Sequence, residues 1–198
     1  MPYLVSTIYK EKGDMHKELQ EADLAQNCYE QCIRLRRQVV GESPHFCVEK
    51  IYFRLADNMM KERCNDVKLR KAAAYLQRDE EMLCEILEEP DPEKARDTCG
   101  SLYLAMHYQY RGKLAARYLD KGACLEHYRV CEQIFLRANG GNSSLIMQSF
   151  FQFYIDDLSE LGLEAEALKY NKLYKATLKK FYEPDNLFYI AYTIDIVA

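Results

Sequence analysis

The segment SSLIMQSFFQFYIDDLSELG, residues 143–162, shows most clearly how this chain folds. Its apolar side chains recur every three or four positions, at Ile146, Phe150, Phe153, Tyr154, Leu158 and Leu161. This spacing places them on one face of an α-helix. Ser143 and Ser144 are typical N-cap residues, and Gly162 is a typical helix stop. The segment therefore predicts an amphipathic helix with a broad buried face.

Short breaks rich in glycine, proline and polar residues divide the rest of the chain. One set of breaks lies at residues 41–44, 89–92, 139–142 and 183–185. A second set lies between them, at residues 13–14, 65–66, 112–113 and 162–163. Within each set the spacing is roughly 45–50 residues, which describes a unit of two antiparallel helices repeated four times.

Helical periodicity fills almost every segment between these breaks, so we expect an all-α protein. The expected helix pairs are 2–12 with 18–40, 44–63 with 67–88, 93–111 with 115–138, and 143–161 with 164–181. Residues 185–198 resemble the first helix of a fifth unit. A single hairpin cannot bury its own apolar face, so neighbours must stack into one curved, right-handed solenoid domain over residues 1–198.

Two stretches carry a family resemblance. Residues 158–170, LSELGLEAEALKY, resemble the turn of a tetratricopeptide repeat, in which a glycine between the helices is followed by a small alanine where the helices approach closely. Residues 22–33 with the break at 40–45 are similar to the longer repeat of kinesin light chains. The second and third units depart from the pattern. Asn65 stands where glycine is usual, and residues 120–122 offer a rival turn to Gly112.

The residue pattern disfavours an enzyme. The sequence contains no phosphate-binding loop, dinucleotide fingerprint, serine-hydrolase elbow or HExxH helix. His107 and His127 lie in helical stretches between aromatic residues, where a buried, hydrogen-bonded histidine is the common case. Cys28 and Cys32 share a helix face, but no Cys-x-x-Cys knuckle is present, so we interpret them as core residues. No cofactor, metal or catalytic residue is predicted.

Composition restricts the partners. The chain has 198 residues, 48% hydrophobic residues and a net charge of −4, which suits a globular domain and opposes strong binding to nucleic acid. No apolar run approaches the roughly 18 residues of a membrane span, and no signal peptide is evident. The eight cysteines, spread through a chain of this size, are interpreted as reduced. We therefore expect a cytoplasmic protein without membrane insertion.

The resemblance implies a protein–protein or peptide interaction scaffold, because tetratricopeptide arrays hold a partner segment in a groove lined by the first helix of each pair. The groove residues that it implies here are Lys10, Phe53, Asp57, Lys61, Leu102, Met106, Tyr110, Gln152 and Asp156. An alternative is a peptide-responsive sensor domain of a larger bacterial regulator. The apolar stripe near residues 194–198 could pair with a second copy, giving a homodimer, or with a further domain.

Overall fold

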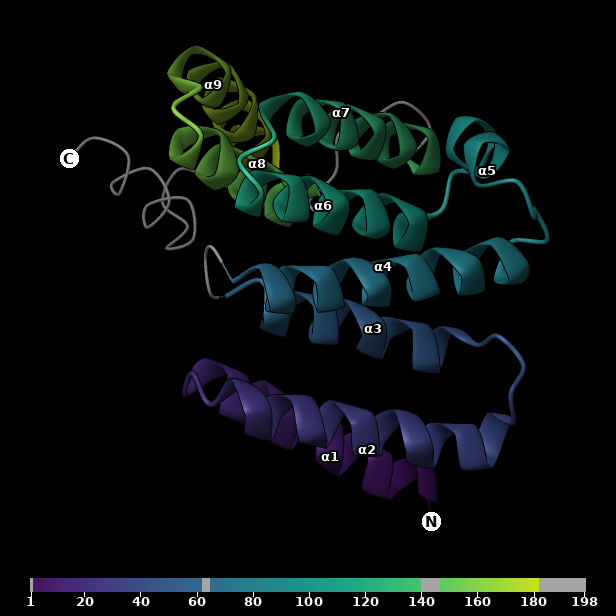
Figure 1. Ribbon diagram of the computed structural model, residues 1–198. Coiled ribbons are helices and arrows are strands. Elements are labelled where there is room, and N and C mark those ends of the chain that lie inside the picture. Colours follow the sequence, from purple (N-terminus) through teal and green to yellow (C-terminus); the bar gives the residue numbers. More distant parts are fainter. Residues whose placement is uncertain (1, 62–64, 140–146, 182–198) are drawn as a thin grey trace.

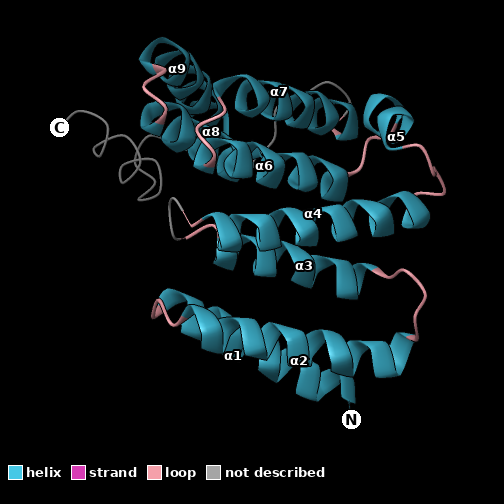
Figure 2. Cartoon of the chain, viewed as in Figure 1, coloured by secondary structure: helices cyan, strands magenta, loops and turns pink. Residues whose placement is uncertain are grey.

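The structure is a computed structural model, and it describes residues 2–61, 65–139 and 147–181. Within these ranges the chain forms helices and loops, without strands (Figure 2). The helices are α1 (Pro2–Glu18), α2 (Ala22–Val40), α3 (Phe46–Met59), α4 (Asp66–Ile86), α5 (Pro92–Thr98), α6 (Leu102–Arg117), α7 (Lys121–Ala138), α8 (Met147–Glu160) and α9 (Glu164–Phe181). The all-α prediction is confirmed for the described residues.

In the described part of the chain, four antiparallel hairpins stack in chain order (Figure 1). They are α1–α2, α3–α4, α6–α7 and α8–α9, here called hairpins 1 to 4. Successive hairpins meet through α2 with α3, α4 with α6, and α6 with α8. The short helix α5 packs beside α4 and α7. The apolar core is therefore spread along the stack between neighbouring hairpins.

Capping residues explain where several helices begin. The side chains of Asn65, Asp91, Ser101 and Asp120 each accept a hydrogen bond from a backbone N–H in the first turn of α4, α5, α6 and α7. Such caps satisfy backbone donors that have no partner within the helix. The break predicted at 65–66 is thus a true helix start, although asparagine replaces the expected glycine.

Two predicted breaks are wrong, because Gly13 and Gly112 lie inside helices. α1 continues through Gly13 to Glu18, and α6 continues through Gly112 to Arg117. Both glycines are buried against a tyrosine ring of the second helix of their hairpin, Tyr29 and Tyr128 respectively. The glycines permit close packing of the two helices of each hairpin. The turn of hairpin 3 falls at 118–120, next to the alternative turn predicted at 120–122.

The predicted helix 93–111 also divides in two. α5 ends at Thr98, and α6 starts three residues after Cys99, with Ser101 as its N-cap. The segment 185–198, with its predicted fifth-unit helix and apolar stripe, lies outside the described residues, as do residues 143–146 of the predicted fourth pair.

The described cysteines are free. Five of them, Cys28, Cys32, Cys84, Cys124 and Cys131, are buried. This confirms the interpretation of Cys28 and Cys32 as packing residues. Among the described residues, no group of histidine, cysteine or carboxylate side chains is arranged to hold a metal ion. Nor does any described helix have the length and apolar character to cross a membrane.

Candidate functional site

Eight of the nine predicted groove residues lie on the first helices of the hairpins, α1, α3, α6 and α8, and Lys61 lies in the turn after α3. Three of them are exposed: Lys61, Gln152 and Asp156. Four are half-buried: Lys10, Leu102, Met106 and Tyr110. The remaining two, Phe53 and Asp57, are buried, with 3% and 7% of their surface exposed.

Phe53 and Tyr110 are brought together. Their rings stack with centroids 5.2 Å apart, across the junction of hairpins 2 and 3. Offset stacking of this kind stabilises a packed pair beyond the area that it buries. Phe53 belongs to the core of the molecule, so it holds α3 against α6 and offers little surface to a partner.

Asp57 is the centre of an ion-pair network that joins three hairpins. Its carboxylate pairs with Lys17 of α1 and with Lys113 of α6. Burial alone would raise the pKa of Asp57, but Lys113 and Lys17 outweigh it and lower the pKa below its ordinary value. Asp57 is therefore ionised at neutral pH, and its charge is matched inside the protein.

Similar pairs continue along the same row of helices. Asp14 of α1 accepts a 2.8 Å hydrogen bond from Arg54 of α3. Arg117 of α6 pairs with Glu160 of α8 and lies 3.7 Å from Asp157. We call these contacts, together with those of Asp57, the ion-pair ladder. The ladder connects α1, α3, α6 and α8 and uses much of the charge on the face where the groove was predicted.

The sequence prediction missed Lys17, Lys113 and Arg117. It ended the first helix at residue 12 and the fifth at residue 111, so Lys17 and Lys113 lay outside the predicted helices and Arg117 was assigned to the next helix, 115–138, instead of α6. Their spacing contains a signal, because Lys113 follows Tyr110 by three positions and Arg117 follows Lys113 by four. Residues at these spacings share one face of a helix.

A buried polar cluster lies between α3, α4 and α6. The Nδ1 atom of His107 is 2.6 Å from Oδ2 of Asp79, and both side chains are inaccessible to solvent. The Nε2 atom of His107 is 3.5 Å from Oε1 of Glu80. His107 is thus buried and hydrogen-bonded, as predicted, but its partners come from a different helix.

Glu49 of α3 belongs to the same cluster. Its pKa is raised to about 9, first by burial and second by the neighbouring Asp79. The pKa of Asp79 is also raised, chiefly by burial. Burial alone would lower the pKa of His107, but Asp79 and Glu80 outweigh it and raise the pKa. The cluster therefore retains protons that an exposed group would lose. Glu49, Asp79 and His107 have no exposed surface, so these three side chains contact other helices and not solvent.

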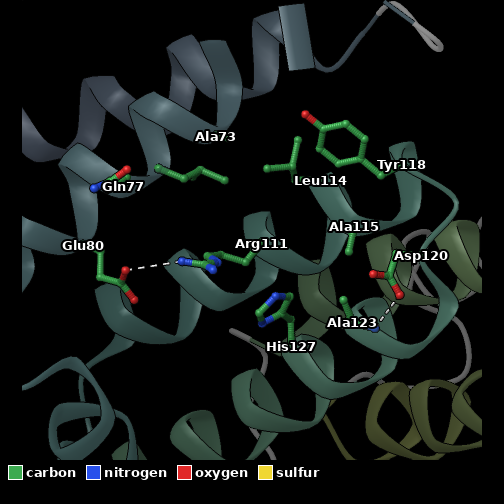
Figure 3. Close-up of a pocket in the computed structure, with 11 residues that line it drawn as sticks. Ala73, Gln77, Glu80, Arg111, Leu114, Ala115, Tyr118, Asp120, Ala123 and His127 are labelled. Atoms are coloured by element: carbon green, nitrogen blue, oxygen red, sulfur yellow. Dashed lines mark hydrogen bonds and ion pairs between the residues drawn. The ribbon is translucent and has the colours of Figure 1, made fainter. Parts of the chain in front are cut away.

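A pocket of about 540 Å³ opens beside this cluster, between α4 of hairpin 2 and α6–α7 of hairpin 3 (Figure 3). Its lining residues are Ala73, Leu76, Gln77, Glu80, Arg111, Leu114, Ala115, Tyr118, Asp120, Ala123 and His127. We call it the hairpin cleft.

Aliphatic side chains and charged groups are both present in the hairpin cleft. Leu76 and Ala115 are buried, whereas Tyr118 is 45% exposed. Glu80 and Arg111 form an ion pair of 3.3 Å that faces into the cleft (Figure 3). Burial first, then Arg111, lower the pKa of His127 to about 4, so its ring is neutral near pH 7 and can donate one hydrogen bond and accept another.

The hairpin cleft and the predicted groove occupy different sides of α6. Arg111, Leu114, Ala115 and Tyr118 face the cleft, whereas the predicted Met106 and Tyr110 lie on another side of the helix. None of the nine predicted groove residues lines the cleft.

Comparison with protein-family models, with curated proteins and with solved structures finds no match for this chain.

Proposed function

We propose that the protein is a non-enzymatic scaffold that binds a segment of another protein, and that its hairpins form a right-handed, tetratricopeptide-like stack. The observation that carries this proposal is the hairpin cleft, an opening of about 540 Å³ between two neighbouring hairpins. Its volume is in the range of sites that bind small ligands and inserted side chains, which is roughly 300–1,000 Å³.

The chemistry of the cleft suits a peptide. Aliphatic residues of α4, α6 and α7 can cover an apolar side chain of the partner, and the charged and polar residues around them can bond to its backbone. Interfaces between proteins commonly combine an apolar centre with a polar rim. The Glu80–Arg111 pair offers both an acceptor and a donor, and neutral His127 adds one of each.

A matched pair of substitutions on α4 tests the proposal. Ala73 lines the hairpin cleft, and the next residue, Ala74, is exposed on α4 and does not line it. Ala73→Arg fills the cleft, whereas Ala74→Arg adds the same side chain and charge outside it. Circular dichroism establishes that both variants remain helical.

Peptide selection from a random display library, followed by binding assays with the chosen peptides, then compares the variants with the native chain. The proposal expects peptides that bind the native chain and Ala74→Arg equally and that bind Ala73→Arg at least tenfold more weakly. Equal affinity for all three chains rules out the hairpin cleft as the binding site. A further variant, Lys61→Glu with Asp156→Lys, then tests the predicted groove on the first helices.

A further inference from the structure

A second pocket, of about 430 Å³, lies at the junction of hairpins 1 and 2 and has a different character. Four cationic side chains line it: Lys10 of α1, Arg36 of α2, and Lys50 and Arg54 of α3. No aspartate or glutamate is among its lining residues. We call it the basic pocket.

Arg36 is the most informative of these cations because it is buried, with 6% of its surface exposed. Its Nε atom donates a hydrogen bond of 3.3 Å to Oγ of Ser6, and Nη1 donates to the carbonyl oxygen of Cys47. Its guanidinium lies 5.6 Å from the ring centroid of Tyr3. These partners are all neutral. Among the described residues no carboxylate pairs with Arg36, although a buried charge is ordinarily matched by an opposite one.

The other cations leave an excess of positive charge. Lys10 pairs with Glu11 and Asp14, and Asp14 is shared with Arg54. Lys50 is exposed and lies 4.7 Å from the ring centroid of Tyr103, with no carboxylate against it in the described part of the chain. Four cations therefore face two carboxylates, an excess of two positive charges in a chain whose net charge is −4.

The beginning of α3 adds the imidazole of His45 and the partial positive charge of a helix N-terminus to the same place. His45, Phe46 and Cys47, which form the N-cap and first turn of this 14-residue helix, line the basic pocket. Nδ1 of His45 accepts a 3.1 Å hydrogen bond from the backbone N–H of Cys47, so the hydrogen of the neutral ring is on Nε2. A helix N-terminus carries a partial positive charge that favours anions.

We infer that the basic pocket binds a phosphate group, as the free ion or as a phosphate monoester. The excess of two positive charges matches the dianion. The guanidinium groups of arginine and the N-termini of helices are the groups with which proteins most often bind phosphate. In the occupied site, Arg36 is the fixed donor because Ser6 and Cys47 orient it, whereas Lys50 and Arg54 approach from α3. This site is separate from the hairpin cleft and goes beyond the proposed function.

The test is a titration followed by nuclear magnetic resonance of the ¹⁵N-labelled full chain, near neutral pH and at constant ionic strength. Three probes are compared: inorganic phosphate, O-phosphoserine and acetate. The inference expects phosphate or O-phosphoserine to shift the backbone amides of Phe46 and Cys47 and the Nε–H signal of Arg36. Acetate should bind at least tenfold more weakly at these positions. The relative affinities of the two phosphate probes identify the free ion or the monoester as the preferred form.

Substitutions distinguish a specific phosphate site from general electrostatic attraction of phosphate to the protein surface. Lys50→Gln removes an exposed cation of the basic pocket and should weaken phosphate binding about fivefold or more, because a charge-assisted hydrogen bond contributes on the order of 1 kcal/mol. Lys71→Gln removes an exposed lysine of α4 and should leave the affinity unchanged. Arg36→Lys, checked for helicity, keeps the charge but loses the oriented fork and should also weaken binding.

Three results overturn the inference: shifts spread over the whole surface, equal loss in Lys50→Gln and Lys71→Gln, or acetate binding as tightly as phosphate. The hairpin-cleft variant Ala73→Arg serves as an independent control, because it should lose peptide binding and keep phosphate binding. Failure of the phosphate site therefore leaves the proposed peptide site untouched.

Discussion

Gly13 of α1 lies directly under the ring of Tyr29 in α2, so that a Cβ atom at residue 13 would stand 2.6 Å from Cε1 of the tyrosine. Hairpin 3 repeats the arrangement with Gly112 and Tyr128, at 2.7 Å. The tyrosine hydroxyls each donate to a carboxylate of the ion-pair ladder, Tyr29 to Asp14 and Tyr128 to Asp157. Because glycine has no side chain, it leaves room for the tyrosine ring of the second helix, whose hydroxyl reaches the ion-pair ladder.

Replacing either glycine by alanine should destabilise the protein. Alanine in a helix interior is favoured over glycine by roughly 1 kcal/mol, but an added methyl group in a filled core costs about 1–3 kcal/mol. We expect Gly13→Ala and Gly112→Ala each to lower the free energy of unfolding, by up to about 2 kcal/mol, measured by urea denaturation. Gly122→Ala is the control. Its nearest neighbour is Oδ1 of Asp120 at 3.6 Å, so no loss is expected. A loss equal to that of Gly112→Ala contradicts the packing explanation.

The turn after α6 should be improved by glycine. Leu119 has a positive φ of 61°, in the left-handed region that disfavours residues with a side chain. Gly162 holds the same place two residues after α8, with φ 69°. Since Leu119 is 70% exposed, Leu119→Gly removes backbone strain and little packing. It should raise the free energy of unfolding by up to about 1 kcal/mol, seen as a higher melting temperature, whereas Gly162→Ala should lower it.

Asp57 should be the most sensitive residue of the ion-pair ladder. Asp57→Asn keeps the shape of the side chain but leaves the ammonium groups of Lys17 and Lys113 facing each other without a counter-ion. Removing one partner of a buried pair commonly costs about 3–5 kcal/mol, and exposed pairs cost about 1 or less. For this nearly buried site we expect a loss of about 2–3 kcal/mol. Adding Lys113→Met should recover part of it, which a double-mutant cycle measures; complete additivity contradicts the coupling.

The buried cluster at His107 should make stability depend on pH. The pKa of Glu49 is raised from 4.5 to about 9, chiefly by burial, so between these values the folded chain holds a proton that the unfolded chain releases. His107, whose pKa is also raised from 6.5, acts in the same direction. The free energy of unfolding should therefore fall as the pH rises from neutral to about 9.

Glu49→Gln tests this explanation, because glutamine keeps the shape without the titration. Asp79, Glu80 and Arg111, which face the cluster from α4 and α6, stay in place. We expect the decline in stability above neutral pH to become shallower in this variant, by up to about 1 kcal/mol per pH unit, in denaturation series at several pH values. The exposed Glu126→Gln should behave as the native chain does. An unchanged slope in Glu49→Gln assigns the pH dependence to other groups.

The sequence was sufficient to predict most of the helices and their pairing, because apolar periodicity and capping residues are local signals, but it did not predict the division of residues 93–111 into α5 and α6. Asn65 and Gly162 mark real ends of this kind. Gly13 and Gly112 misled the prediction, since glycine is used both to end helices and to let two helices approach. Which of these roles a glycine has depends on the residue that faces it. The facing residues here, Tyr29 and Tyr128, come sixteen residues later in the chain.

The candidate site was harder to predict than the fold. The resemblance placed Phe53 and Asp57 on an open groove, but Tyr110 covers the former and two lysines neutralise the latter. Both outcomes depend on contacts between hairpins, which a repeat pattern does not specify. The hairpin cleft was missed for the same reason: it forms where α4 meets α6 and α7, and no single segment of sequence contains it.

Asp57 accepts ion pairs from hairpins on both sides of its own, whereas hairpin 4 contacts hairpin 3 through the ion pairs of Arg117, the Tyr128–Asp157 hydrogen bond and the packing of Phe150 and Tyr154 against Tyr128. Under a stretching force applied at the two ends of the chain, these bonds would not share the load evenly. The Asp57 contacts would hold the first three hairpins together until they broke, and hairpin 4 would separate only when its aromatic packing against Tyr128 was lost.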